Sequence, residues 1–194
     1  MKKLLVTLVL SLFLHVSVSA GDKEYVLDTT HSHVGFSIKH MMISNVKGDF
    51  KSYEADLVFD SKTKIFKKVN AIIDANSIDT GITKRDNHLR SADFFDVANH
   101  SSIKFSMIKY VANENGGKMY GTLSIRGVNK DIVLNTTIHG VIKDFDGNER
   151  VGFTLEGEIN RKDFGLTWNK LLETGGFAVG ENVKLIVEIE AIEL

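Results

Sequence analysis

Apolar and polar residues alternate along most of the chain after residue 20, with the period of two that is typical of β-strands buried on one face. The clearest example lies near the C-terminus, where the apolar positions are Val183, Leu185, Val187 and Ile189. The intervening positions are mostly polar: Asn182, Lys184, Glu188 and Glu190. The same period recurs in six other segments: Val34/Phe36/Ile38, Val69/Ala71/Ile73, Ile103/Phe105/Met107, Leu123/Ile125, Ile132/Leu134/Ile138 and Val151/Phe153/Leu155/Ile159.

One segment, residues 78–96, breaks this period and predicts a short helix. Asp79 or Thr80 is expected to cap its N-terminus, because both residue types accept hydrogen bonds from free helical amides. Asp86 and Arg90 are four residues apart and could pair along one helix face. The helix is therefore the single interruption of an all-β chain.

Turn residues separate the predicted strands and favour hairpins. They are Asn115-Gly116-Gly117, the corner at 126–129 and Asp146-Gly147-Asn148, where Gly and Asn tolerate positive φ. About eight antiparallel strands with one apolar face must pack on a second sheet or close into a barrel. Mid-strand glycines suit a strongly curved sheet. We expect a lipocalin-like antiparallel β-barrel, with a sandwich as the alternative.

Composition excludes several classes of protein. The chain has 194 residues, the size of about one domain. A formal net charge of -1 offers no basic stripe for nucleic acid. The chain contains no cysteine, so disulfides, thiol catalysis and cysteine-ligated metals are excluded.

The first twenty residues predict a cleaved signal peptide. Lys2 and Lys3 precede an apolar run from Leu4 to Leu14, and Val18-Ser19-Ala20 is a small-residue cleavage site. The run is shorter than the ~18 to 20 apolar residues that a membrane span needs. We expect cleavage near Ala20, a mature domain over residues 21–194 in the periplasm or secreted, and no stable membrane insertion.

Three histidines, His31, His33 and His40, stand in one ten-residue stretch and raise the question of a metal enzyme. In a strand, His31 and His33 point away from Val34, Phe36 and Ile38 and so lie on the polar face or rim. A His-x-His pair supplies two of the three or four ligands that zinc requires. Further ligands could come from a scattered set: Asp28, His88, His100 and His139. We predict no metal, and a His-dependent metalloenzyme stays open as an alternative.

Catalytic motifs are missing from the sequence. It has no Gly-x-Ser-x-Gly, no His-Glu-x-x-His and no Walker-type phosphate loop. An enzyme is therefore unsupported by the motifs, although their absence does not exclude one.

Seven segments together resemble the YceI family of bacterial periplasmic proteins. Besides Leu27-Asp28 with HSHVGFSIKH, they are NVKGDF (45–50), DLVFD (56–60), SIDTGITKRDNHLRSADFFD (77–96), GTLSIRGVNKDIVL (121–134), VGFTLEGEINRKDFGLTWN (151–169) and VKLIVEIEAIEL (183–194). The resemblance implies a lipocalin-like barrel, often dimeric, that carries a polyisoprenoid, an isoprenoid quinone or a fatty amide. It also implies a binding protein, so we predict no catalytic residues and no cofactor. The family often has proline within 99–101 and at Asp131, so local turn geometry is in doubt there.

Inward-facing apolar residues are the candidate lining of such a lumen: Phe36, Ile38, Met42, Phe105, Met107, Leu123, Ile125, Phe153, Leu155 and Trp168. Candidates for a polar head group lie on the predicted helix and near the C-terminus: Arg85, Asn87, His88 and Arg161. Two alternatives stay open. The apolar residues could fill a dry core in a structural or stress-related barrel, and Arg85 and Asp86 could form ion pairs with Arg161 and Asp163.

Overall fold

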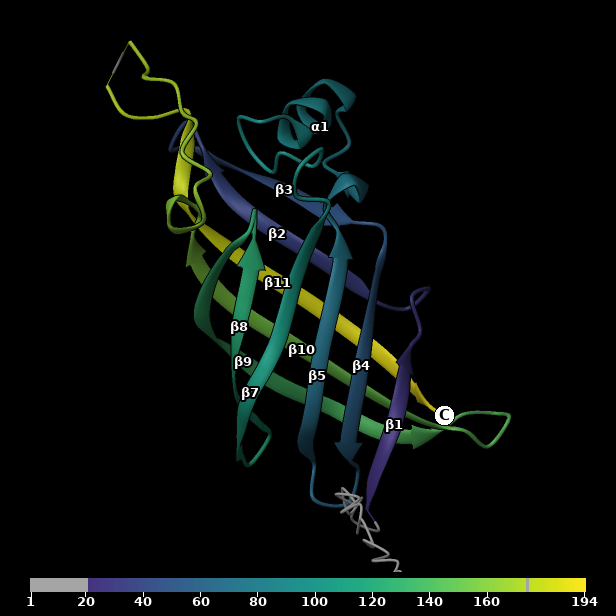
Figure 1. Ribbon diagram of the computed structural model, residues 1–194. Coiled ribbons are helices and arrows are strands. Elements are labelled where there is room, and N and C mark those ends of the chain that lie inside the picture. Colours follow the sequence, from purple (N-terminus) through teal and green to yellow (C-terminus); the bar gives the residue numbers. More distant parts are fainter. Residues whose placement is uncertain (1–20, 174) are drawn as a thin grey trace, which may run out of the picture.

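The computed structural model describes residues 21–173 and 175–194, and the predicted signal peptide lies outside them. Eleven strands dominate the fold (Figure 1). They are β1 (Asp22–Leu27), β2 (His33–His40), β3 (Ser44–Phe50), β4 (Tyr53–Asp60), β5 (Ile65–Asp74), β6 (Ile78–Asp79), β7 (Ser102–Asn113), β8 (Gly116–Ile125), β9 (Val128–Lys143), β10 (Glu149–Asn160) and β11 (Val179–Glu193). The helices are α1 (Thr83–Arg90) and two 3-10 turns, η1 (Ala75–Ser77) and η2 (Arg161–Phe164).

Eight of these strands close into an antiparallel barrel, which confirms the predicted fold class. Their order is β1-β4-β5-β7-β8-β9-β10-β11, and β11 pairs again with β1. Strand β11 changes partner along its length. Its Val183–Glu188 part pairs with β2, and Ala191 pairs with Leu27 of β1. Strands β2, β3 and β6 pair in this order beyond β11. They extend the sheet at the end of the barrel that carries α1 (Figure 1).

The predicted turn residues join the strands as tight hairpins. Arg126 and Gly127 both have positive φ, 53° and 74°, and connect β8 to β9 in two residues. At the β9–β10 hairpin, the Asp144 carboxylate accepts hydrogen bonds from the amides of Asp146 (3.0 Å) and Asn148 (2.9 Å). Short turns of this kind fix the register of neighbouring strands and therefore which side chains face inward.

An aromatic cluster fills the barrel at the end away from α1. The ring centroid of Phe66 lies 4.7 Å from that of Phe59, 4.9 Å from Phe153 and 5.1 Å from Tyr110. Phe59 and Phe66 are almost completely buried. One end of the barrel is therefore plugged by side chains, and α1 lies over the other.

The helix begins differently from the prediction. Its N-cap residue is Ile82, which makes no side-chain cap. Asp79 instead accepts a hydrogen bond from the Gly81 amide (2.8 Å), and the Thr80 amide and hydroxyl donate to buried Asp86. The expected capping by Asp79 or Thr80 is thus wrong, because both residues form contacts that hold the preceding loop.

The expected pair between Asp86 and Arg90 is also not formed. The Arg90 guanidinium donates to the carbonyl oxygens of Asn76 (2.7 Å) and Ile78 (2.6 Å). Both helical side chains therefore hold α1 onto the segment that follows β5. Among the described residues, no helix is long and apolar enough to cross a bilayer.

Candidate ligand-binding cavity

The barrel encloses a cavity of about 580 Å³ between the aromatic plug and α1. Its wall is built almost entirely from apolar side chains on the inward faces of the strands. Alternation with period two explains this lining, because every second residue of a closed barrel faces the interior. The volume lies within the range of roughly 300–1,000 Å³ that is typical of small-molecule sites.

Eight of the ten predicted lumen residues lie on the cavity wall: Phe36, Ile38, Phe105, Leu123, Ile125, Phe153, Leu155 and Trp168. Met42 and Met107 do not. Met42 sits in the β2–β3 turn with φ 64° and is exposed, because the strand ends two residues before it. Met107 packs partly buried against the core at a register shift in β7, and the cavity wall does not reach it.

The cavity wall also contains residues outside the predicted lumen set. Several of them belong to strands that alternation predicts: Val69, Ala71, Ile73, Ile132, Leu134, Val183, Leu185 and Val187. Others come from β1, β3 and β4: Leu27, Phe50, Tyr53, Ala55 and Leu57. In β4 the alternation of Tyr53, Ala55 and Leu57 was a usable signal.

Polar groups reach the cavity at its α1 end. Arg85 and His88 line it from the helix, whereas Asn87 points elsewhere and accepts a hydrogen bond from Arg90 (3.2 Å). Arg85 donates through Nε to the Thr80 hydroxyl (2.7 Å) and through Nη2 to the Thr80 carbonyl (2.8 Å). Of the three predicted head-group residues on the helix, Arg85 and His88 therefore line the cavity and Asn87 does not.

His88 is held in place by one carboxylate and two rings. Its Nε2 is hydrogen-bonded to Asp93 Oδ2 (2.8 Å). Its ring stands edge-on to Trp168 and Phe94, with centroid distances of 4.8 and 5.0 Å. The imidazole therefore has a fixed orientation at the cavity wall.

Arg161 is buried at the same end, with 4% of its surface exposed. Its guanidinium donates to the carbonyl oxygens of Gly180 (2.7 Å), Leu166 and Val179. Burial lowers the pKa of Arg161 below its ordinary value. The ion pairs of the described residues include none between α1 and Arg161 or Asp163, so the expected helix-to-barrel salt bridges are not formed.

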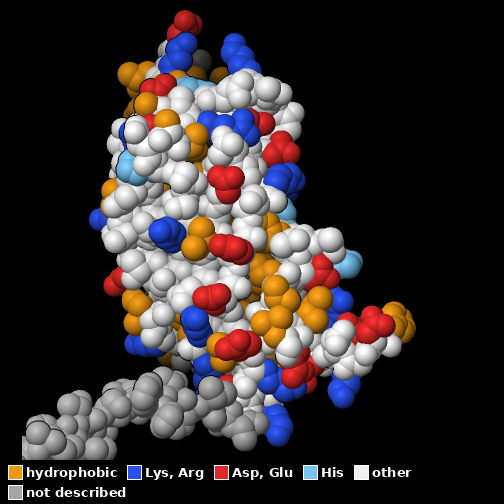
Figure 2. Space-filling model, turned by 45° about the vertical axis from the view of Figure 1, so that its right-hand side comes forward, with side chains coloured by type: hydrophobic (Ala, Val, Ile, Leu, Met, Phe, Trp, Pro, Cys, Tyr) orange, Lys and Arg blue, Asp and Glu red, His pale blue; other side chains and the backbone are white. Residues whose placement is uncertain are grey.

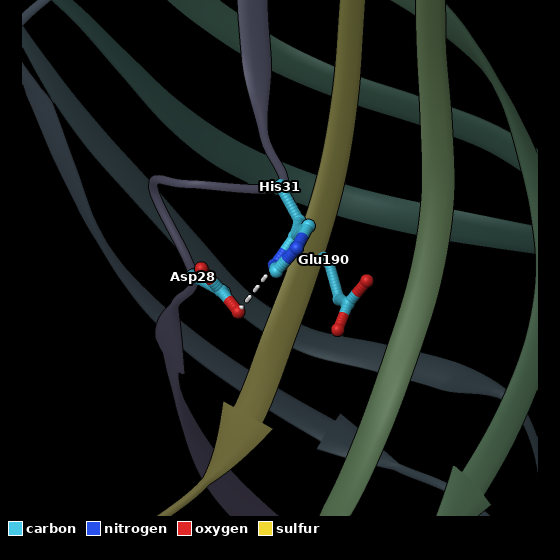
Figure 3. A group of neighbouring side chains, drawn as sticks. All are labelled: Asp28, His31 and Glu190. Atoms are coloured by element: carbon cyan, nitrogen blue, oxygen red, sulfur yellow. Dashed lines mark hydrogen bonds and ion pairs between the residues drawn. The ribbon is translucent and has the colours of Figure 1, made fainter. Parts of the chain in front are cut away.

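His31 and His33 lie apart from the cavity and have different partners, whereas His40, at the end of β2, lines the cavity. His31 Nδ1 is 2.9 Å from Asp28 Oδ2, beside Glu190 (Figure 3). His33 instead faces Asp49 (3.6 Å). The two imidazoles therefore do not form the chelating pair that a shared metal site would need.

The Arg150 guanidinium pairs with the acids beside His31. Arg150 Nη1 contacts Asp28 (2.8 Å) and Glu190 (2.6 Å), and Arg150 Nε contacts Asp144 (2.8 Å). Hydrogen bonds from Thr30, His31 and Arg150 hold the pKa of Asp28 well below its usual value, and Asp28 raises the pKa of His31. This cluster is a network of ion pairs that joins β1, β10 and β11.

The sequence of the chain matches the model of the YceI-like domain over residues 25–191. The chain belongs to the YceI-like family. A UPF0312 protein of Staphylococcus epidermidis is 38% identical to it over 86% of this chain and 96% of the relative. Protein YceI of Salmonella newport is 34% identical over the whole chain and 99% of the relative.

Solved structures share the YceI-like fold. The YCEI protein of Campylobacter jejuni is 44% identical, with a TM-score of 0.72 over 89% of this chain and 99% of that one. A polyisoprenoid binding domain of Saccharophagus degradans has a TM-score of 0.66 at 16% identity, over 89% of this chain and 99% of that domain. The second likeness concerns the fold alone. Together these matches place the cavity inside a fold that the family has in common.

Proposed function

We propose that this protein is a periplasmic carrier that binds a long-chain amphiphile, such as a polyisoprenoid, an isoprenoid quinone or a fatty amide, in the barrel cavity. The observation that carries the proposal is the apolar cavity of about 580 Å³ in a barrel closed at its far end. The polyisoprenoid binding domain with the same fold supports the choice of ligand class. We propose no catalytic activity.

The chemistry of the wall favours a hydrocarbon chain. Each buried CH₂ group contributes about 0.8 kcal/mol, so ten carbons contribute on the order of 8 kcal/mol before the costs of immobilisation. A charged ligand would lose its hydration without finding a partner along this wall. The tail is therefore expected to lie toward the aromatic plug, with any polar head at the α1 end.

Arg85 and His88 are the residues best placed to contact a head group. Arg85 has N–H groups beyond the two that Thr80 accepts, and these can donate to a phosphate, carbonyl or amide. Arg161 also lines the cavity, but it uses three of its five N–H groups on backbone carbonyls, one more than Arg85 uses on Thr80. We therefore assign Arg161 to holding the loop and Arg85 with His88 to the head group.

The alternatives raised by the sequence have less support. A filled structural barrel is at odds with the cavity. A metalloenzyme would need Arg150 to leave the carboxylates of Asp28 and Glu190.

Periplasmic location rests on the predicted signal peptide, and a homodimer rests on the resemblance to the family. Cell fractionation and light scattering test these two parts of the proposal.

The test is identification of the ligand together with a blocked cavity. Gently purified protein should release one lipid on solvent extraction, and native mass spectrometry should show the same mass on the folded protein. Ala71→Phe places a ring in the cavity and should reduce bound lipid at least tenfold. Ala112→Phe, the matched control on exposed β7 surface, should keep it. Consistently empty protein that takes up no isoprenoid or fatty amide would refute the proposal.

A further inference from the structure

Exposed apolar side chains gather at the α1 end of the barrel. We call them the rim: Met41, Met42, Ile43, Ile82, Leu171 and Phe177. Ile43 and Leu171 have 83% and 72% of their surface exposed. Single exposed apolar residues are ordinary, but a group of six at one end of a protein indicates an interaction surface.

Backbone contacts hold the rim together beside the cavity mouth. The Met41 amide donates to the Ala178 carbonyl (2.8 Å), and Leu171 forms a β-bridge with Phe177. Ile82, at the start of α1, and Ala178 both line the cavity. The rim is therefore continuous with the opening through which a ligand would pass.

Basic side chains flank this apolar surface. Lys39, Lys84 and Lys170 are exposed, and none of them takes part in an ion pair among the described residues. Glu173 is an exposed acidic residue on the same loop as Lys170. Figure 2 shows hydrophobic side chains next to Lys and Arg side chains at the upper end of the molecule. Three exposed lysines that are outside the ion pairs of the described residues thus lie beside the rim.

We propose that the rim docks on the surface of a membrane containing anionic phospholipids, so that the amphiphile passes between bilayer and cavity without crossing water. This inference rests on the proposed carrier function. Exposed methionine, isoleucine, leucine and phenylalanine side chains can enter the boundary between head groups and acyl chains. Lysines near an anionic surface add attraction that salt screens.

Vesicle sedimentation tests the docking directly. Vesicles of phosphatidylglycerol and phosphatidylcholine should bind the purified protein, and vesicles of phosphatidylcholine alone should bind it more weakly. Ile43→Ser with Leu171→Ser should weaken binding roughly tenfold or more, because two apolar side chains are lost. Lys84→Gln with Lys170→Gln should remove most of the salt dependence. Ile142→Ser, at a residue of β9 outside the rim that is 65% exposed, is the control and should bind as the unmodified protein does.

Lipid carried in the cavity is measured separately by native mass spectrometry on each variant. Docking that depends on the rim, with cavity lipid retained, supports the inference. If protein that carries no cavity lipid still docks through the rim, the result would support membrane docking and refute the carrier function. Equal binding by the rim variants and the unmodified protein would overturn the inference. So would a dimer in gel filtration that the rim variants abolish while vesicles bind none of the proteins.

Discussion

Gly121 in β8 lies against the ring of Phe105, which forms part of the cavity wall. A Cβ atom at Gly121 would lie 2.3 Å from Phe105 Cζ and 2.7 Å from the Ser106 carbonyl oxygen. Both distances are far below van der Waals contact, and the carbonyl belongs to the paired strand. Glycine is therefore required here by close approach of two strands.

Gly121→Ala is expected to destabilise the protein by about 1–3 kcal/mol, because the ring of Phe105 must move into the cavity. Gly140→Ala in β9 is the matched control, since a Cβ there meets nothing within 4 Å. That variant should be neutral or slightly more stable, by up to about 1 kcal/mol. Urea unfolding of both variants measures the difference. Equal stability of the two would contradict the close approach.

At the scale of elements, Arg161 joins η2 to the first residues of β11. Its guanidinium supplies hydrogen bonds to carbonyl oxygens in Leu166, Val179 and Gly180, which lie on both sides of the loop at the cavity mouth. The side chain is buried, so these carbonyls have little access to water. Arg161 thus fixes the path of the chain into β11.

Arg161→Met keeps much of the side-chain volume but leaves those carbonyls without their donor. We expect a loss of about 2–4 kcal/mol in the free energy of unfolding. Lys162→Met is the control, because Lys162 is exposed and its ion pair with Glu181 is worth less than about 1 kcal/mol. Thermal or urea unfolding gives both values. A loss no larger than that of the control would show that Arg161 is dispensable.

Elements with clean alternation could be predicted from the sequence, and those fixed by distant contacts could not. The inward faces of β7, β8 and β10 were predicted because Phe105, Leu123 and Phe153 follow the period of two. The division of β11 between β1 and β2 depends on pairing across most of the chain. The start of α1 was mispredicted because Asp86 competes for Thr80.

The candidate site shows the same division. Its apolar wall follows from alternation, and the placement of Arg85 and His88 together follows from their helical spacing. Met42 was assigned to the lumen because sequence alone does not show the left-handed turn that ends β2. The partners of Arg161 are backbone carbonyls, which leave no mark in the sequence.

For the molecule as a whole, closure of the barrel depends on the place where β11 passes from β2 to β1. The Asp28 amide donates to the Glu190 carbonyl there (2.9 Å), and Arg150 joins Asp28, Glu190 and Asp144. Hydrogen bonds lower the pKa of both Asp28 and Asp144. A carboxylate with a lowered folded-state pKa stabilises the fold above its unfolded pKa of about 4, and this stabilisation is lost as the pH falls.

His31 adds the opposite dependence at higher pH. Asp28 raises the pKa of His31, so the protonated imidazole stabilises the fold below about pH 6.5, and that share is lost as the pH rises through the raised value. Asp28→Asn removes both effects. The difference in free energy of unfolding between the unmodified protein and the variant should therefore be largest between about pH 4 and pH 6.5, at about 1–3 kcal/mol.

The difference should shrink below about pH 3 and decrease in part above about pH 7, where the pair of Asp28 with Arg150 still contributes. Urea unfolding across this pH range measures it. Asp56→Asn is the control, because Asp56 is exposed and its single ion pair among the described residues is with Lys68. A constant difference at every pH would mean that Asp28 acts through packing. Its charge would then have no part in closing the barrel.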